Sequence, residues 1–274
     1  MNRDSKKTVC LTIAGLDPSG GAGIIADIKT FSAFDCFAAA AVSSVTFQNT
    51  TGVFGAVHQT ADSVRKQVEA VLDDYTVAAV KTGMLPTREI IETVAEVIAE
   101  RKLTNIVVDP VVRSTSGFDL IDDAALTALI EKLFPLADLI TPNIPEAERI
   151  AKMSIISTDD IKKAAAIMRE LGARNVLIKG GHFLEVKSEE LKVESSDEKA
   201  IDHLFMGEEL IYFEAEFIET TATHGTGCTL AAAIAANLAL GKDLIEAVKI
   251  AKDFVTEAIQ TAPHIGKGHS PINI

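Results

Sequence analysis

The sequence predicts an α/β fold built around a central, mostly parallel sheet. Short apolar runs with strand-like composition alternate with longer segments of helical periodicity along most of the 274 residues. This alternation is typical of parallel strands joined by right-handed helical crossovers. Because 47% of the residues are hydrophobic and no linker rich in Pro, Gly and Ser divides the chain, we expect one domain, residues 1–274, around a large core.

The first half of the chain opens with a strand, a loop and a helix. Residues 8–14 form a β-rich apolar run that ends at Gly15, and helical periodicity follows over 23–34, after a loop rich in Gly, Pro and Ser. Further strands are expected at 38–45, 53–57, 78–81 and 105–109, and further helices at 61–72, 88–101 and 123–133.

The second half continues the alternation. Strands are expected at 139–141, 175–179 and 209–217, and helices at 145–153, 159–171, 227–240 and 244–261. Charged residues crowd together over 185–202, which predicts an exposed flap or hairpin. Since ligands of open α/β sheets bind beyond the carboxyl ends of the strands, the loops that follow the strands are the candidates for function.

The composition restricts the class of partner. Acidic residues number 39 and basic residues 26, and the net charge of -13 argues against nucleic acid or a membrane surface as a partner. The three cysteines have no metal-ligand spacing, so we expect neither a disulfide framework nor a zinc site, and a reducing cytoplasm as the location. His182 and His224 also lack such spacing and are interpreted as loop or capping histidines. No segment has the character of a signal peptide or a membrane span, so a soluble protein is expected.

The heptapeptide 223–229, Thr-His-Gly-Thr-Gly-Cys-Thr, is the clearest candidate for chemistry. Gly225 and Gly227 precede Cys228 where an alanine-rich helix begins. The first N–H groups of a helix have no partner within it and can face an anion, and a thiol in the same positive field has a lowered pKa. The pattern indicates phosphate chemistry, although a plain tight turn is the commoner reason for such glycines.

The loop 15–23 is the second candidate. It lacks the Gly-Lys-Ser/Thr ending of a P-loop, and its partial match to a dinucleotide fingerprint begins too far from the strand. A glycine loop that lets a substrate lie against backbone is the better interpretation, with Asp27 facing that substrate, unless Asp27 only favours the helix dipole. Together with Gln48 it would offer a carboxylate and an amide to the polar edge of a heteroaromatic ring.

Other chemistry-bearing residues follow the later strands. Met84 offers an adaptable apolar surface to a flat ring, or belongs to the core. Asp109 and Glu146 could hold Mg²⁺ or its waters through hard oxygen atoms, or be a turn acid and a helix-start acid. Lys179 would supply a point charge for phosphate, or be an edge lysine before a tight turn.

In this order, these strings resemble hydroxymethylpyrimidine/phosphomethylpyrimidine kinases of thiamine biosynthesis, which belong to the ribokinase-like superfamily. The resemblance rests on Asp-Pro-Ser-Gly-Gly-Ala-Gly-Ile at 17–24, Gln-Asn-Thr at 48–50, Lys-Thr-Gly-Met at 81–84, Val-Asp-Pro-Val at 108–111, Thr-Pro-Asn-Ile-Pro-Glu-Ala at 141–147, Lys-Gly-Gly-His at 179–182 and the heptapeptide. It covers essentially the whole chain and implies a ribokinase-like three-layer α/β/α sandwich.

The resemblance implies ATP-dependent phosphorylation of 4-amino-5-hydroxymethyl-2-methylpyrimidine, and then of its monophosphate, by a homodimer. It implies that Asp27 and Gln48 hydrogen-bond the aminopyrimidine edge. The other implied roles are ring lining by Gly15, Met84 and Val111, placement of Mg²⁺ by Asp109 and Glu146, contact with the ATP phosphates by Asn143, Lys179 and Thr223, and an anion hole for the transferring group formed by Gly225, Gly227 and Cys228.

By the same resemblance, Cys228 stands where sugar kinases of the superfamily carry an aspartate base. A thiolate there could accept the hydroxyl proton, or the side chain could only shape the anion hole. The chain departs from the family pattern at Thr115, where a lysine is usual, and at Ser270, which replaces a glycine. The missing lysine puts the second phosphorylation in question.

Two other functions stay open on the sequence alone. A pyridoxal kinase phosphorylates a similar hydroxymethyl heteroaromatic ring, and a non-catalytic pyrimidine-binding module would keep the fold without the chemistry. Retention of the candidate thiol, metal and phosphate residues argues against the module.

Overall fold

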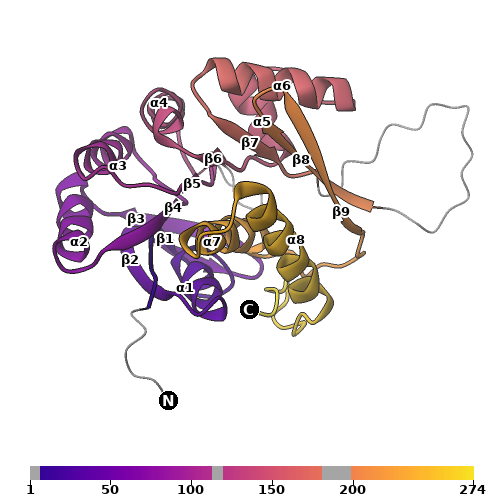
Figure 1. The fold of residues 1–274 in the computed structure, drawn as a ribbon. Helices are drawn as coiled ribbons and strands as arrows, with labels where there is room; N and C mark the ends of the chain where they lie inside the picture. The colour runs from indigo at the N-terminus through magenta and orange to yellow at the C-terminus, as the bar shows by residue number, and fades with distance from the viewer. Residues whose placement is uncertain (1–6, 113–119, 181–198) are drawn as a thin grey trace, which may run out of the picture.

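The computed structural model describes residues 7–112, 120–180 and 199–274, and within these ranges nine strands form one sheet (Figure 1). The strands are β1 Val9–Leu16, β2 Phe37–Asn49, β3 Gly52–His58, β4 Val77–Thr82, β5 Ile106–Val108, β6 Leu139–Ile140, β7 Asn175–Ile178, β8 Lys199–Met206 and β9 Glu209–Glu216. Their order across the sheet is β3-β2-β1-β4-β5-β6-β7-β8-β9. The strands from β2 to β7 in this order pair in parallel, and β3, β8 and β9 join the two edges antiparallel. The predicted central, mostly parallel sheet is confirmed.

Helices cover both faces of this sheet. They are α1 Gly23–Ala33, α2 Ala61–Asp74, α3 Arg88–Glu100, α4 Asp123–Ala128, α5 Ile144–Ala151, α6 Thr158–Glu170, α7 Thr226–Ala239 and α8 Leu244–Gln260. In Figure 1, α1, α7 and α8 gather on one side of the sheet, and α2, α3, α4 and α6 on the other. The three-layer α/β/α sandwich implied by the resemblance is therefore confirmed. Among the described helices, none combines the length and the apolar composition needed to cross a membrane.

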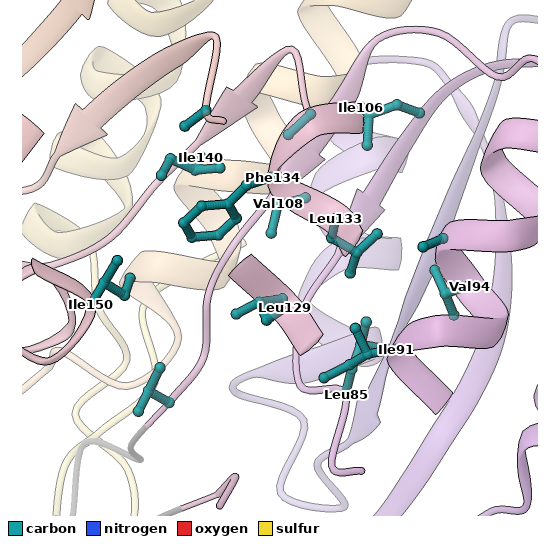
Figure 2. Packing of buried hydrophobic residues seen from close by; sticks show 14 of the residues in the cluster. Leu85, Ile91, Val94, Ile106, Val108, Leu129, Leu133, Phe134, Ile140 and Ile150 are labelled. Carbon is teal, nitrogen blue, oxygen red and sulfur yellow. The ribbon is translucent and has the colours of Figure 1, made fainter. Parts of the chain in front are cut away.

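Each central strand contributes to two hydrophobic cores. Along β5, Ile106 and Val108 belong to the core under α2 to α6, whereas Val107 belongs to the core under α1, α7 and α8. Successive side chains of a strand point to opposite faces, so a strand covered on both sides is apolar throughout. Figure 2 shows the first of these cores, which also contains Ile91 of α3 and Phe134.

The helix starts differ in a way that matters for function. Six of the described helices begin after a Ser, Thr, Asp or Asn whose side chain accepts a hydrogen bond from the first turn. Helices α1 and α7 begin after Ala22 and Gly225 and have no side-chain cap. Their first N–H groups are therefore not taken up by a capping side chain, although the Thr226 N–H at the start of α7 donates to the Thr223 carbonyl at 3.4 Å.

Two predicted limits differ from the structure. The charge-rich stretch 185–202, predicted as an exposed flap or hairpin, ends in Lys199–Met206, which forms β8 and in which Asp202 is buried. The strand predicted over 38–45 is longer and includes Gln48, because β2 stays paired with β3 through to Asn49. The helix predicted over 123–133 keeps both limits: α4 covers Asp123–Ala128, and a wider π-helical turn follows over Leu129–Leu133.

Three features of the sequence lie outside the described residues. They are Thr115 with its neighbours in 113–119, His182, and the charge-rich stretch up to residue 198.

Candidate active site

A cavity of about 1340 Å³ opens where the parallel strands end, which is the place that an open α/β sheet offers to ligands. Its wall is formed by segments that follow the parallel strands, by the start of α7, and by parts of β2, α5, β8, β9 and α8. All but one of the predicted site residues line it: Gly15, Gln48, Met84, Asp109, Val111, Asn143, Glu146, Lys179, Thr223, Gly225, Gly227 and Cys228. The fold thus gathers residues from distant parts of the chain around one space.

The uncapped starts of α1 and α7 both face this cavity. The backbone at Gly225 has a φ of +89°, and a Cβ there would lie 1.8 Å from the carbonyl oxygen of Gly21. Only glycine fits such a close approach in the left-handed region. Free N–H groups at the start of a helix, together with the helix dipole, attract an anion. The loop Gly225–Cys228, called the phosphate cradle below, therefore offers a place that could hold an anion such as phosphate.

Lys179 places a cation against this cradle. Its Nζ donates to Asp109 Oδ1 at 2.9 Å, and the hydroxyl of Thr141 donates to the same oxygen at 3.1 Å. Burial disfavours both charges, but their attraction outweighs it, so the pKa of Lys179 lies above its ordinary value and the pKa of Asp109 below. A Cβ at Gly227 would lie 3.1 Å from Lys179 Nζ. Glycine at this position lets the ammonium group reach the cradle.

Glu146 stands in the first turn of α5 and forms a reciprocal cap with Asn143. The Asn143 N–H donates to Glu146 Oε2 at 2.8 Å, and Glu146 N–H donates to Asn143 Oδ1 at 2.9 Å. Burial raises the pKa of Glu146 to about 7; Lys179 opposes this shift and Asp109 adds to it. At neutral pH this carboxyl is therefore poised between its two protonation states.

The two carboxylates fit a magnesium ion bound mainly through water. Within the described residues, no three His, Cys, Asp or Glu side chains gather as a metal site. Mg²⁺, however, is usually held by one or two carboxylates, several waters and substrate phosphates. Asp109 and Glu146 share the cavity wall, and the repulsion by Asp109 that raises the pKa of Glu146 is what a cation would relieve.

Asp27 is the predicted site residue that does not reach the wall. It has no exposed surface, and both its carboxylate oxygens lie 2.9 Å from Lys81 Nζ. The hydroxyl of Thr12 donates to Oδ2 at 2.6 Å. The implied direct hydrogen bond from Asp27 to a ring does not fit this geometry, because the carboxylate is occupied inside the protein. Asp27 instead holds Lys81, which does line the cavity.

Lys81 is a second buried cation, and the sequence pattern did not assign it a role. Burial alone would lower the pKa of Lys81, but Asp27 and Asp109 keep it above its ordinary value, so the amine stays charged. A lysine inside the apolar run of β4 was a visible signal, since such a charge is rarely buried without a partner. The partner, however, is 54 positions away in the sequence.

The thiol of Cys228 does not have the low pKa expected of a helix start. Burial raises its pKa to about 11; Lys81 opposes this shift, whereas Asp109 and Asp27 add to it. The group is therefore a protonated thiol at neutral pH, which favours the second of the two alternatives, a side chain that shapes the anion hole, over a resident thiolate. The reason is that desolvation and two nearby carboxylates outweigh the helix dipole, whose contribution is at most about 2 kcal/mol.

Another part of the wall suits a flat ring. A Cβ at Gly15 would lie 3.1 Å from the sulfur of Met84, so glycine leaves the space over this side chain open. Val111 adds apolar surface, and Gln48 adds an amide with both a donor and an acceptor.

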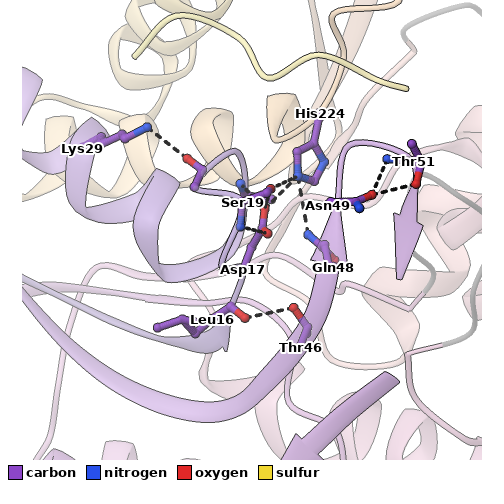
Figure 3. Close-up of polar contacts among 11 residues, drawn as sticks. Leu16, Asp17, Ser19, Lys29, Thr46, Gln48, Asn49, Thr51 and His224 are labelled. Atoms are coloured by element: carbon purple, nitrogen blue, oxygen red, sulfur yellow. Dashed lines mark hydrogen bonds and ion pairs between the residues drawn. The ribbon is translucent and has the colours of Figure 1, made fainter. Parts of the chain in front are cut away.

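An acid–histidine pair also lines the cavity, although His224 was interpreted from the sequence as a loop or capping residue. His224 Nε2 lies 2.7 Å from Asp17 Oδ2, and Gln48 Nε2 lies 3.5 Å from the same ring nitrogen (Figure 3). Ser270, which the sequence left without a role, supports this pair, because its carbonyl accepts the His224 N–H at 3.2 Å. Asp17 and His224 both belong to motifs identified in the sequence, the loop 15–23 and the heptapeptide 223–229. Their separation in the sequence does not predict that the two side chains are in contact.

A third buried lysine–carboxylate pair fixes the end of β7. Asp202 of β8 accepts a hydrogen bond from Lys252 of α8 at 2.7 Å and another from the Gly180 N–H at 3.0 Å. Because Gly180 directly follows Lys179, the pair holds the strand end that carries the phosphate-facing cation. No local pattern predicts this pair, since Asp202 lies in a charge-rich stretch and Lys252 in an amphipathic helix.

The fold and the cavity together define a ribokinase-like phosphotransferase that acts on a small molecule. Buried cations and a helix start are arranged for phosphate, and a glycine, a methionine and an amide are arranged for a ring, all around one space. Such a site positions reactants and stabilises charge, which is what phosphoryl transfer requires of a protein.

The chain belongs to the phosphomethylpyrimidine kinase family, whose model matches residues 17–273. It is 44% identical over 263 residues to the hydroxymethylpyrimidine/phosphomethylpyrimidine kinase of Bacillus subtilis, covering 96% of this chain and 93% of that protein. The structure of a phosphomethylpyrimidine kinase from Clostridium difficile is 40% identical with a TM-score of 0.78, covering 92% and 100%. The pyridoxal kinase of Staphylococcus aureus in complex with AMP-PCP and pyridoxal is 34% identical with a TM-score of 0.86, covering 98% and 94%. The predicted family and fold are confirmed.

The raised pKa of Glu146 makes a prediction about stability. A carboxyl whose pKa moves from 4.5 to about 7 on folding contributes stability that is complete below pH 4.5 and is lost as the pH rises through 7. Glutamine serves as well as glutamate in the helix cap. Without added metal, Glu146→Gln should therefore be more stable than the wild type at pH 8, by on the order of 3 kcal/mol, and equal to it at pH 4.5. Denaturation curves at both pH values check this, and parallel pH profiles of the two proteins would contradict it.

Proposed function

We propose that the protein transfers the terminal phosphate of ATP to the hydroxymethyl oxygen of 4-amino-5-hydroxymethyl-2-methylpyrimidine, and then phosphorylates the monophosphate, in the biosynthesis of thiamine diphosphate. One observation carries the proposal: a single cavity joins the phosphate cradle at Gly225–Cys228 to the ring surface at Gly15, Gln48 and Met84. The name of the Bacillus subtilis relative describes this reaction on the pyrimidine and its monophosphate.

ATP and Mg²⁺ are the proposed cofactors. Lys179 and the backbone amides of the cradle supply positive charge where the transferred phosphoryl group becomes more negative. Asn143 and Thr223 lie on the same wall and would contact the nucleotide phosphates. Asp109 and Glu146 would hold Mg²⁺, which supplies charge neutralisation for those phosphates. The complex of the Staphylococcus aureus relative with AMP-PCP supports the choice of nucleotide.

Cys228 is the side chain proposed to meet the reacting hydroxyl. Because its pKa is raised to about 11, the sulfur carries a proton at neutral pH and does not remove the hydroxyl proton beforehand. In a loose transition state the alcohol becomes strongly acidic only as its oxygen bonds to phosphorus. The proton would then pass late to an oxygen of the transferred phosphoryl group, and until then Cys228 would hold the hydroxyl in line within the cradle.

A homodimer formed through the β2–β3 edge is part of the proposal. Phe47, Phe54 and Val57 are 52%, 66% and 55% exposed on these two paired strands. Large apolar side chains that gather on a surface mark an interaction site, and the family resemblance implies a second copy of the chain as its occupant. A cytoplasmic location is also proposed, since Cys10, Cys36 and Cys228 are all free thiols.

Pyridoxal kinase is the second candidate function. It is favoured by one observation, the close structural likeness to the Staphylococcus aureus enzyme that binds pyridoxal. Pyridoxal also presents a hydroxymethyl group on a flat ring, so the apolar wall alone does not separate the two substrates.

A substrate assay separates these functions. With ATP and Mg²⁺, we expect kcat/KM for the aminopyrimidine to exceed that for pyridoxal at least tenfold, which corresponds to about 1.4 kcal/mol in transition-state binding. Chromatographic resolution of the monophosphate and diphosphate products also measures the second phosphorylation. A preference for pyridoxal would assign the second function. Tight calorimetric binding of the pyrimidine without ATP consumption would indicate a binding module.

Replacement of the thiol tests the proposed chemistry. Cys228→Ala should lower kcat by roughly 10² or more, because it removes the group that positions the hydroxyl in the transition state, and change KM for the pyrimidine by less than about threefold. Steady-state kinetics with both substrates varied provide the measurement. An unchanged kcat would reject a catalytic role for Cys228.

A further inference from the structure

Strand β7 leaves its pairing with β8 just before the lysine that faces the phosphate cradle. The two strands pair antiparallel as far as Ile178. Lys179 follows, and its backbone N–H donates to the Pro142 carbonyl at 2.9 Å, on the other side of β7. Gly180 packs so closely on β8 that a Cβ there would lie 1.8 Å from the Ile201 carbonyl oxygen. The backbone that carries Lys179 is therefore at a place where regular strand pairing no longer fixes it.

A side chain takes over from the strand backbone at this place. The Gly180 N–H donates to Asp202 Oδ1 at 3.0 Å, and Asp202 Oδ2 accepts a hydrogen bond from Lys252 Nζ at 2.7 Å. Each carboxylate oxygen thus has its own donor. Asp202 is only 4% exposed and Lys252 8%, so water is poorly placed to replace either bond. Because a buried N–H without a partner costs free energy, Gly180 depends on this carboxylate.

Lys252 keeps the carboxylate in position. Asp202 belongs to β8 and Lys252 to α8, so the pair connects the last helix of the chain to the end of β7. A buried carboxylate requires a compensating charge, which Lys252 supplies. The terminal torsion of an Asp side chain is otherwise broad, and the bond to Lys252 restricts it. Oδ1 is thereby held toward the Gly180 N–H.

The position of the Lys179 ammonium group depends on this backbone. Nζ lies at the end of a long side chain, so a small rotation at the backbone displaces it by a larger distance. The space available to it is small, because a Cβ at Gly227 would lie 3.1 Å from Nζ. A misplacement of about 1 Å, caused by a change far from the reacting atoms, can cost about 10²-fold in rate.

We propose that the Asp202–Lys252 pair is a positioning device for Lys179, which holds the backbone of residues 179–180 so that the ammonium group reaches the phosphate cradle. The inference rests on the proposed function, in which Lys179 contacts the ATP phosphates, and it adds two residues that set the affinity for them. Because Asp202 and Lys252 also line the cavity, the experiment must separate this role from direct contact with the nucleotide.

Two double variants differ only in the acceptor that they offer to Gly180. Asp202→Asn/Lys252→Met and Asp202→Ala/Lys252→Met both remove the two charges, but only asparagine keeps an oxygen that can accept the Gly180 N–H. Calorimetry with AMP-PCP and Mg²⁺ measures nucleotide affinity without turnover. We expect Kd to rise at least about tenfold in the alanine variant, as for a weakened hydrogen bond to a charged group, and to change by less than about threefold in the asparagine variant.

A Lys179→Met background identifies the route of the effect. In it, Asp202→Ala/Lys252→Met should change Kd for AMP-PCP by less than about twofold, because the residue through which the pair acts is gone. Kd for 4-amino-5-hydroxymethyl-2-methylpyrimidine without nucleotide is the second control and should not change in the alanine variant. Asp202→Ser/Lys252→Met carries the test if the alanine variant does not fold, because a serine hydroxyl is too short to reach Gly180.

Three results would overturn the inference: equal affinities for AMP-PCP in the alanine and asparagine variants, a loss of the aminopyrimidine as large as that of AMP-PCP, or a full effect in the Lys179→Met background. Loss of AMP-PCP in both double variants would indicate direct contact between the pair and the nucleotide. Failure of the wild type to bind AMP-PCP would overturn the inference as well. Failure to phosphorylate the pyrimidine, in a wild type that binds AMP-PCP, would count against the proposed function alone.

Discussion

Two lysines are held inside the protein at the ends of parallel strands, and the site depends on the carboxylates that hold them. Lys81 lies with Asp27 and Lys179 with Asp109, each pair at 2.9 Å. Removing either partner of a buried pair leaves an uncompensated charge and costs about 3–5 kcal/mol. The pairs therefore fix two cations within the fold before any ligand binds. The free-energy cost of burying the two ammonium groups is thus offset by their carboxylate partners before a phosphate enters the cavity. Such preorganised charge is the main means of catalysis in phosphoryl transfer.

The sheet and the glycines make this arrangement possible. Parallel pairing brings the ends of β1, β4, β5 and β7 to one edge, so residues far apart in the chain converge there. The start of helix α7 can then lie close to its neighbours because two of its residues have no Cβ. Gly225 packs against the backbone of the loop that follows β1, and Gly227 packs against Lys179. No side chain caps this helix start, so its N–H groups can serve the phosphate in the proposed function. Fold, charge and helix start thus serve one chemical task.

Much of this could be predicted from the sequence, and the exceptions share a physical reason. Alternating periodicity predicted the parallel sheet, and ordered motifs predicted which strand-end loops line the cavity. Three features depend on contacts between residues far apart in the sequence, which no local sequence pattern predicts. They are the burial of Asp27, the position of Lys81 at the cavity, and the Asp17–His224 pair. The pKa of Cys228 depends on the balance between a helix dipole, burial and two carboxylates, and only coordinates supply the last two. Strand β8 was not predicted because its first half belongs to a charge-rich stretch that lacks the apolar pattern of a strand.

In the proposed function, these preformed cations and the helix start hold the phosphate that is transferred. A crystal structure of the protein with AMP-PCP, Mg²⁺ and the aminopyrimidine tests this directly. The γ-phosphate should lie within hydrogen-bonding distance of Lys179 Nζ and of backbone N–H groups at 225–228, with the hydroxymethyl oxygen beside Cys228. A γ-phosphate bound elsewhere in the cavity, with Lys179 still paired only with Asp109, would contradict it.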